Sequence, residues 1–500
     1  MGFVLKLAKI MMQHHQKISS WWVWLVIGLP VVFLIYLGVT SRMDISCDAI
    51  GYENIGRILQ QKGWAGYLSN GPQREPVYPL SIALSMSLAS LLGISFFKIQ
   101  TALQIGLIFL SMGMLWKLLR RIEVPFKIAA CCVAYFGLSP AIMNSALSLY
   151  AEIVTYPLIL GIILVSLSLY SALRQQQLVR ALIQSALLGV LMTLMTLSKG
   201  TFELVAPLYG MFFLLIVWGR LRVVSGGWRG SYILIIGLSL LIWGTLVGEY
   251  KMLNKAYNGN YVLTDRGPRH FYGNMIMRTQ PLTKTRLKAA LASVPGDGVC
   301  RAVSAPEDCA FWNFQQCDFY GMQMLDQISK EGKNIETANK KLIALSIEGI
   351  GTNPLQYTAL TLLESLKMFF WESTKVGFVT YPDWLDKLYD KGLFKNGLRL
   401  VITLATVLSF GWILFQGSKL PVGIALTACL AVLFILTHAL GSVLTRYAFP
   451  VVPLYMGCIA YWLSQVSWTA WIRVFKNWNF YFIGVTGLYI LWRLKIYLLH

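Results

Sequence analysis

Long stretches without charge recur along the chain and predict its secondary structure. Eight of them contain no Asp, Glu, Lys or Arg: 21–40, 99–116, 128–151, 153–173, 181–198, 231–248, 400–418 and 447–472. Residues 420–445 qualify as well, and 204–219 and 477–492 are marginal. Each approaches the ~20 residues that a helix needs to cross a hydrocarbon core roughly 30 Å thick. Since lipid cannot satisfy the backbone of isolated strands, we expect an all-α polytopic membrane protein of about 11 spanning helices.

Residues 76–97 are also uncharged, but the charges of later loops argue against a full crossing. The short loops 117–127, 174–180 and 220–229 are rich in Lys and Arg, which mark the cytoplasmic side. If the N-terminus is cytoplasmic too, 76–97 must form a juxtamembrane or re-entrant helix. We therefore expect five segments: 1–40 with the first span, 41–97 as a first outer loop, 98–249 with further spans, 250–395 as a large outer loop, and 396–500 with the last spans.

The net charge of +21 and the pI of about 9.6 fit this topology. In a membrane protein, basic residues collect in cytoplasmic loops. A nucleic-acid-binding protein would show a basic stripe with interleaved aromatic residues outside the spans, and none is present in the sequence. The expected location is the cytoplasmic membrane, with both large loops on the periplasmic or outer face.

The cysteines divide between spans and outer loops. Cys131, Cys132, Cys429 and Cys458 fall within spans, where they serve as packing residues. The other four, Cys47, Cys300, Cys309 and Cys317, fall in the outer loops and are candidates for two disulfides. Cys300 and Cys309 are the most probable local pair. Zinc binding is the competing interpretation, but the spacing is not that of a CxxC motif.

Single charged residues mark several outer turns. Asp48 follows the first span, and Glu152 and Lys199 lie between later spans. Arg446 comes directly before the uncharged stretch 447–472. Each has an ordinary alternative: Asp48 could cap the helix that follows it, and the others could extend to the membrane surface. Because ionisable residues at membrane depth are costly and usually functional, their shared side suggests one outer cavity, with Arg74 as a further cation.

Such a set of residues suits the transfer of a sugar from a lipid phosphate. A carboxylate can accept a proton from an acceptor hydroxyl as that hydroxyl attacks. Lys and Arg can hold a phosphate whose negative charge grows as it leaves. A leaving group with a lipid tail would require this site at the bilayer surface.

The order of these features resembles the C-type glycosyltransferase superfamily, which includes protein O-mannosyltransferases and lipid A aminoarabinose transferases. The matching positions are an acidic residue and a Tyr after the first span, a basic residue and Pro before a Tyr, an acidic residue at a helix start, a Lys-Gly turn, an Asn-Pro opening a loop helix, and an Arg-Tyr followed by prolines. Here these are Asp48, Tyr52, Arg74, Pro76, Tyr78, Glu152, Lys199, Gly200, Asn353, Pro354, Arg446, Tyr447, Pro450 and Pro453. Glu75 departs from the pattern, and 256–350 has no counterpart.

The resemblance implies a monomeric enzyme that takes a sugar from a polyprenyl-phosphate donor. Asp48 would act as general base, and Glu152 would help to position sugar or acceptor. Lys199, Arg446 and Arg74 would contact the donor phosphate, and Tyr52, Tyr78 and Tyr447 would position substrates. His270, next to Arg266 and Arg269, is a further candidate for phosphate or acceptor contact. We expect no cofactor and no metal, although some relatives use a divalent cation.

Sugar and acceptor remain open from the sequence: the acceptor could be lipid A, another glycan or a protein. Two other classes also remain. A lipid-linked oligosaccharide polymerase or ligase would lack the early carboxylate. A lipid or sugar flippase would show internal repeats and short loops on both sides.

Overall fold

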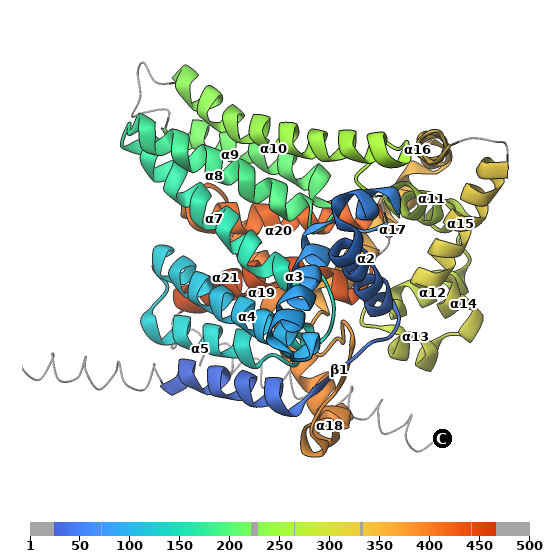
Figure 1. The fold of residues 1–500 in the computed structure, drawn as a ribbon, viewed down its shortest axis with the longest axis horizontal. Helices are drawn as coiled ribbons and strands as arrows, with labels where there is room; N and C mark the ends of the chain where they lie inside the picture. Colours follow the sequence, from blue (N-terminus) through green and yellow to red (C-terminus); the bar gives the residue numbers. More distant parts are fainter. Residues whose placement is uncertain are drawn as a thin grey trace, which may run out of the picture.

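The computed structural model describes residues 25–466 except 72, 222–228, 265, 331–333 and 442. Long helices form a bundle, and shorter helices gather at one end of it (Figure 1). Eight helical segments are long and apolar enough to cross a membrane: α4 (Phe96–Arg121), α7 (Glu152–Arg174), α8 (Leu178–Thr196), α9 (Phe202–Leu221), α10 (Arg229–Asn258), α19 (Gly392–Gln416), α20 (Val422–Leu440), and η3 (Thr445–Val451) continued by α21 (Val452–Gln465). The all-α polytopic class is thus confirmed.

The helix count differs in detail from the sequence expectation. The first apolar helix is described over Leu25–Thr40, and α10 continues to Asn258, beyond the expected start of the large loop at residue 250. The marginal stretch 204–219 lies within α9, whereas 477–492 lies outside the described residues.

The uncharged stretch 128–151 does not form one straight helix, because two helices meet there at an angle of 49°, as in a broken span or a re-entrant loop. These are α5 (Phe126–Leu138) and α6 (Pro140–Leu147). Ser139 between them is extended, and its hydroxyl accepts a hydrogen bond from the Ile142 amide. Pro140 has no N–H to continue α5 and fits the first turn of a new helix, so the break follows from local sequence.

The first predicted outer loop contains α2 (Asp48–Ser69), with a break in helical geometry at Gly63, and α3 (Val77–Leu92). Strand β1 (Arg42–Asp44) precedes them and pairs antiparallel with β2 (Phe378–Thr380). The beginning of the first loop is therefore joined to the end of the large loop. Helix α3 has only 16 residues and packs between α2 and α4, which suits the juxtamembrane position expected for 76–97.

The large loop folds into a cap of short helices beside α2 (Figure 1). They are α11 (Arg266–Thr279), α12 (Lys284–Ser293), α13 (Asp297–Val303), α14 (Pro306–Phe311), α15 (Phe314–Lys330), α16 (Ile335–Thr352), α17 (Pro354–Ser365) and η1 (Leu366–Phe369). Helix α18 (Asp383–Asp390) follows β2 and lies apart from this cap, below β1 in Figure 1. A last 3-10 turn, η2 (Gly417–Lys419), precedes α20. The predicted loop helix opened by Asn353 and Pro354 is α17.

One of the two predicted disulfides is present in the cap. Cys300 and Cys309 are bonded, as expected for the local pair. Cys47 and Cys317 are free thiols, so the second disulfide is wrong. Cys317 is buried where α15 crosses α11, with its backbone against Gly273, whereas Cys47 is exposed before α2. The two residues thus belong to different packing units.

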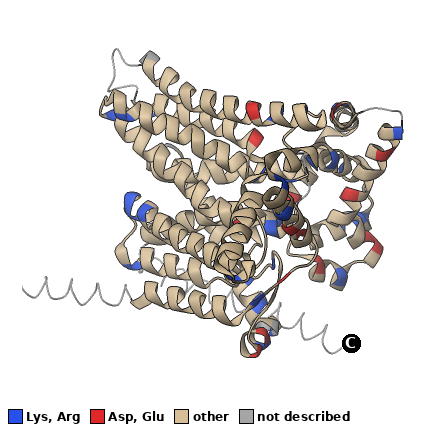
Figure 2. Cartoon of the chain, viewed as in Figure 1, with Lys and Arg blue, Asp and Glu red and all other residues tan. Residues whose placement is uncertain are grey.

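Charged side chains are unevenly distributed along the bundle. Figure 2 shows acidic residues mainly toward the end where the two loops gather, whereas the opposite helix ends carry mainly Lys and Arg. Arg120 and Arg121 end α4, Arg174 ends α7 and Arg220 lies in the last turn of α9. This distribution is the one that the positive-inside rule describes, and the orientation itself stays a prediction.

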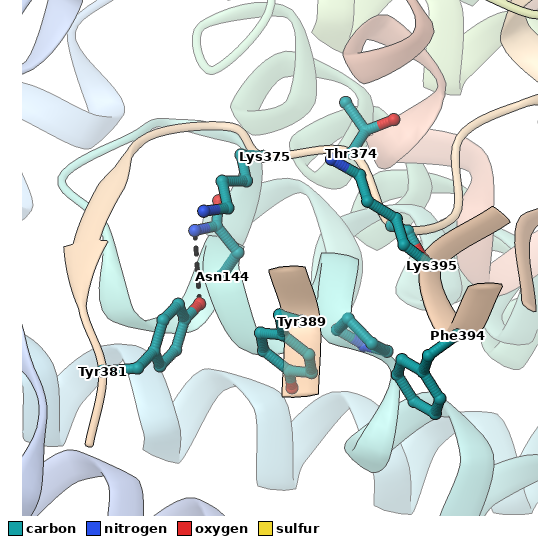
Figure 3. Close-up of a pocket in the computed structure, with 9 residues that line it drawn as sticks. Asn144, Thr374, Lys375, Tyr381, Tyr389, Phe394 and Lys395 are labelled. Atoms are coloured by element: carbon teal, nitrogen blue, oxygen red, sulfur yellow. Dashed lines mark hydrogen bonds between the residues drawn. The ribbon is translucent and has the colours of Figure 1, made fainter. Parts of the chain in front are cut away.

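Asn144 of α6 fixes the segment that leads from the cap to β2. Its side-chain oxygen accepts hydrogen bonds from the Val376 and Gly377 amides at 2.6 and 3.2 Å. Its amide group donates to the Gly377 carbonyl and to the Tyr381 hydroxyl, the latter shown in Figure 3. A side chain at Gly377 would collide with Tyr150 and Ser148. The segment is thus held closely against α6.

Candidate functional site

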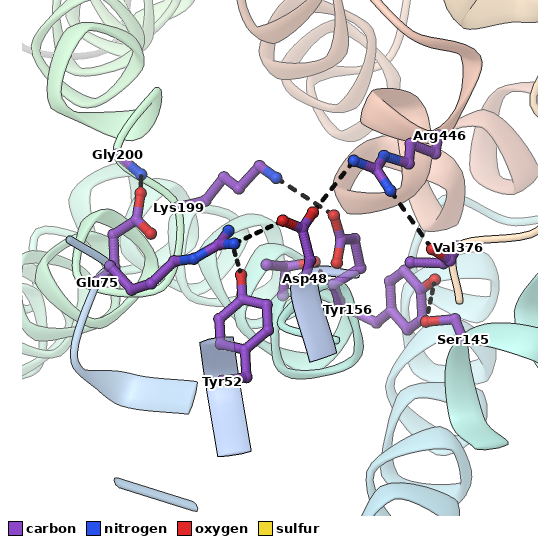
Figure 4. A network of polar contacts seen from close by, with 12 residues as sticks. Asp48, Tyr52, Glu75, Ser145, Tyr156, Lys199, Gly200, Val376 and Arg446 are labelled. Atoms are coloured by element: carbon purple, nitrogen blue, oxygen red, sulfur yellow. Dashed lines mark hydrogen bonds and ion pairs between the residues drawn. The ribbon is translucent and has the colours of Figure 1, made fainter. Parts of the chain in front are cut away.

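Asp48 lies at the centre of a cluster of charged side chains (Figure 4). It is the first residue of α2, but the N-cap is Cys47 and makes no side-chain cap, so the capping alternative is wrong. One carboxylate oxygen accepts a hydrogen bond from Arg74 at 2.6 Å, and the other accepts one from Arg446 at 3.2 Å. The Asp48 side chain remains 34% exposed. A small molecule can therefore reach it.

Arg74 is packed more deeply than Asp48. Its guanidinium lies 4.5 Å from the centre of the Tyr52 ring and donates a long hydrogen bond of 3.5 Å to the Tyr52 hydroxyl. Burial raises the pKa of Tyr52 to about 12, so the phenol stays neutral. Tyr78 meets the Tyr52 ring edge-on at 5.1 Å and donates to Gln104 inside the bundle. Tyr78 thus supports Tyr52 from behind.

Lys199 and Glu152 form a second ion pair in the same region. Glu152 is the first residue of α7, and Lys199 lies in the turn between α8 and α9. Their charged atoms are 3.3 Å apart, and both side chains are largely buried. Burial opposes the charge on Lys199, but the Glu152 carboxylate together with Tyr52, Tyr447 and Glu75 outweighs burial and raises the pKa of Lys199 above its usual value. Lys199 is therefore a permanent cation.

Tyr447 joins the two ion pairs. Its ring lies 5.3 Å from the Lys199 ammonium and 5.8 Å from the Arg446 guanidinium. His438 of α20 stacks on the same ring, with centroids 4.6 Å apart. Arg446 also donates to the Val376 carbonyl and lies 5.9 Å from the Tyr150 ring. Asp48, Arg74, Glu152, Lys199, Arg446 and Tyr447 thus form one site, which we call the Asp48 cluster.

Glu75, which interrupts the expected motif, fixes the Lys199 turn in place. Its carboxylate accepts a hydrogen bond of 2.7 Å from the Gly200 amide (Figure 4). The Val77 amide donates to the Leu197 carbonyl nearby, and the Tyr67 hydroxyl donates to the Arg74 carbonyl. The first outer loop is thereby tied to the turn between α8 and α9. The sequence showed Glu75 beside the motif, but it did not show that the Gly200 amide is its hydrogen-bond partner.

Among the predicted site residues, Tyr78 is buried behind Tyr52 and His270 lies outside the Asp48 cluster. It lies in the cap beside Asp318, at 3.8 Å, and packs on Phe314. Burial and the neighbouring Arg269 lower the pKa of His270 to about 4, so the ring is neutral. Phe314 in turn contacts Tyr447, with ring centroids 6.5 Å apart. His270 therefore packs on Phe314, which contacts the edge of the cluster. The geometry does not support a direct contact between His270 and a phosphate.

The cluster carries an excess of positive charge. Burial favours a higher pKa for Asp48, but the charges of Arg74, Arg446 and Arg266 outweigh it and hold the pKa of this carboxyl below its usual value. Four cations (Arg74, Lys199, Arg266, Arg446) face three carboxylates (Asp48, Glu75, Glu152). The surplus of one positive charge, with three tyrosine rings around it, suits an anion attached to an organic group.

Three contributors escaped the sequence analysis altogether: Tyr150, His438 and Asn144. Asn144 and His438 lie in apolar stretches without a charged neighbour in sequence, so no local signal distinguishes them from packing residues. Tyr150 lies two residues before Glu152, and that proximity was the one available signal. Among the described residues, no group of three or more His, Cys, Asp or Glu side chains is arranged to hold a metal ion.

Comparison of the chain with protein-family models and with curated proteins yields no match. The geometry of the site and the order of its motifs are therefore the basis for assigning a function.

Proposed function

We propose that the protein is a membrane glycosyltransferase that moves a sugar from a polyprenyl-phosphate donor to an envelope acceptor. The observation that carries the proposal is the partly exposed Asp48 carboxylate beside Arg446. The Tyr447 ring lies between Arg446 and Lys199 and contacts both cations. A base and a phosphate-binding pair are thereby close neighbours, at the end of the helices where the two large loops gather.

In this mechanism Asp48 accepts the proton of the acceptor hydroxyl as the oxygen attacks the anomeric carbon. The bond between that carbon and the phosphate oxygen breaks, and the electron pair leaves with the lipid phosphate. Arg446 and Lys199 stabilise the negative charge that develops on the phosphate. Glu152 keeps Lys199 oriented, and the partly exposed Tyr447 ring offers a surface for the sugar, whereas Tyr52 and Tyr150 are buried and support the cations.

Donor binding would also prepare the base. In the free protein Arg74 and Arg446 both contact Asp48 and lower its pKa. A phosphate that draws the charge of Arg446 away would raise the pKa of Asp48 and make it a better proton acceptor. Arg74, buried against Tyr52, would keep the carboxylate aligned. On this view Arg74 orients Asp48, and its expected contact with phosphate is secondary.

The test compares Asp48→Asn with Asp44→Asn. Asp44 is a carboxylate four positions earlier, in β1, where it accepts a hydrogen bond from Thr380 outside the cluster. Mass spectrometry of envelope glycolipids and glycans from cells without the native gene would measure transfer. We expect sugar addition to be lost in Asp48→Asn, by about a thousandfold or more, and retained in Asp44→Asn, with equal amounts of both proteins in the membrane. Full activity of Asp48→Asn would rule out the base assignment. The size of the added unit would separate a single-sugar transferase from an oligosaccharide ligase.

A further inference from the structure

A pocket separate from the Asp48 cluster lies between α6, α18 and the start of α19 (Figure 3). Its lining includes two lysines, Lys375 and Lys395, and four hydroxyl-bearing side chains, Ser373, Thr374, Tyr381 and Tyr389. Pro140, Asn144 and Phe394 complete it. None of these residues is among those that the sequence analysis selected.

Two of the hydroxyls are buried without a protein partner. The oxygens of Ser373 and Tyr389 find no hydrogen-bond partner among the described residues, although Ser373 is only 8% exposed. An unsatisfied buried hydroxyl costs free energy, and native proteins keep few of them. Here both belong to the lining of one pocket that also holds two ammonium groups. This combination favours a ligand with negative charge and several acceptor oxygens.

The surroundings of the pocket indicate that this ligand is a lipid. Phe394 and Lys395 lie in the first turn of α19, at the start of a candidate span. The exposed apolar side chains Leu400, Val401 and Leu404 continue along the same helix. Trp384 of α18 is exposed and donates to Tyr36, near the end of the apolar helix Leu25–Thr40. Exposed Trp at the ends of apolar helices is typical of the membrane–water interface.

We propose that this pocket binds the phosphate-bearing headgroup of an anionic membrane lipid. Lys375 and Lys395 pair with the phosphate, Ser373 and Tyr389 donate to its oxygens or to glycerol hydroxyls, and the acyl chains lie along α19. The same segment reaches the Asp48 cluster, because the Val376 carbonyl accepts from Arg446 and Thr374 contacts Thr445. A bound lipid would therefore hold this segment, and with it Arg446, in position.

The test measures lipid retention by the purified full-length protein with native mass spectrometry. Phosphatidylglycerol is the probe, phosphatidylcholine is the zwitterionic control, and inorganic phosphate is the competitor. We expect Lys375→Gln/Lys395→Gln to weaken phosphatidylglycerol binding about tenfold or more, because two charge-assisted contacts are lost. Lys288→Gln/Lys387→Gln, which neutralises two exposed lysines outside the pocket, should bind like the wild type.

Ser373→Ala gives an independent check that does not remove charge. Since its hydroxyl has no protein partner, the variant should keep the thermal stability of the lipid-free protein and lose lipid affinity severalfold. Unchanged phosphatidylglycerol binding in both Ser373→Ala and the double lysine variant would overturn the proposal. Equal competition by millimolar inorganic phosphate would overturn the lipid assignment and leave a site for soluble phosphate. Asp48→Asn should bind the lipid normally, which separates this site from the proposed transfer reaction.

Discussion

Asp48 illustrates how much a single side chain depends on its neighbours. A carboxylate at the first position of a helix usually interacts with the helix N-terminus. Here Arg74 and Arg446 come from segments 26 and 398 residues away and hold both oxygens. Cys47, just before it, adopts a positive φ of 51°, which non-glycine residues rarely do. The chain thus turns sharply to present Asp48 to the two arginines.

The charge of Arg74 should be visible in the pH dependence of transfer. In Arg74→Gln the ionised form of Asp48 loses its shortest ion pair, so the pKa of Asp48 rises. The acidic limb of kcat/KM should move to higher pH by about one unit. Measurements of kcat/KM between about pH 3 and pH 7 would show this shift of the acidic limb. Arg57→Gln, an exposed arginine of α2 paired with Glu53, is the matched control. A lower rate with an unmoved acidic limb would assign Arg74 a purely structural role.

At the scale of elements, the site depends on two backbone clamps. Glu75 ties the first outer loop to the turn that carries Lys199, and Asn144 ties α6 to the segment that supports Arg446. Both clamps use a side chain that binds main-chain groups far away in sequence. They fix the position of cations without touching a substrate.

The Glu75 clamp can be tested by graded substitution. Glu75→Ala leaves the Gly200 amide without its acceptor, at a cost of about 1 kcal/mol, and should lower transfer by loosening the Lys199 turn. Glu75→Gln keeps an acceptor oxygen and should restore most of the activity. Donor KM and kcat, measured separately, would show the difference. If Glu75→Gln is as impaired as Glu75→Ala, the charge of Glu75 matters more than its hydrogen bond.

The Asn144 clamp should matter for stability as well as activity. Asn144→Leu keeps the size of the side chain but leaves the Val376 and Gly377 amides buried without a partner. Each such loss costs about 1–3 kcal/mol, so the thermal midpoint should fall. Asn144→Asp, which can still accept from both amides, should be intermediate. Thermal unfolding followed by intrinsic fluorescence would rank the three proteins, and equal midpoints would contradict the clamp.

At the scale of the whole molecule, the two large loops form one assembly around the end of the helix bundle. The β1–β2 pairing, the Asp48–Arg446 contact and the Asn258–Leu68 hydrogen bond all connect segments of the two loops or their flanking helices. One assembly can face only one side of a membrane. We predict that this side is the outer one, because Lys and Arg prevail at the opposite helix ends.

Native Cys47 provides a test of this orientation. It is an exposed free thiol in the first loop, so a membrane-impermeant maleimide should label intact spheroplasts at this position. Cys47→Ser should remove that label, and adding Asn70→Cys at an exposed position should restore it. Labelling only after permeabilisation would place the Asp48 cluster on the cytoplasmic side.

The hydrophobic pattern alone determined the membrane class and most of the long helices. It did so because lipid imposes length and apolarity on every spanning helix, and both are local properties of sequence. The cysteine spacing also indicated the short disulfide, since its two cysteines are only nine positions apart. The hydrophobic pattern did not predict the bend at Pro140 within 128–151, because hydropathy continues through that bend. The expected second disulfide was wrong, because Cys47 and Cys317 belong to different packing units.

The sequence predicted that the candidate charges face one outer cavity, and only the tertiary structure decided which of them contact one another. Asp48, Arg74, Glu152, Lys199, Arg446 and Tyr447 come together because the first loop folds back onto the turns between later spans. The same folding leaves His270 behind Phe314 and brings in Glu75, Tyr150 and Asn144. Contacts between segments hundreds of residues apart leave no periodic trace in the sequence, because they depend on where whole helices cross. That is why the sequence predicted a membrane bundle with candidate charges on one face, and the structure alone decided which charges form ion pairs.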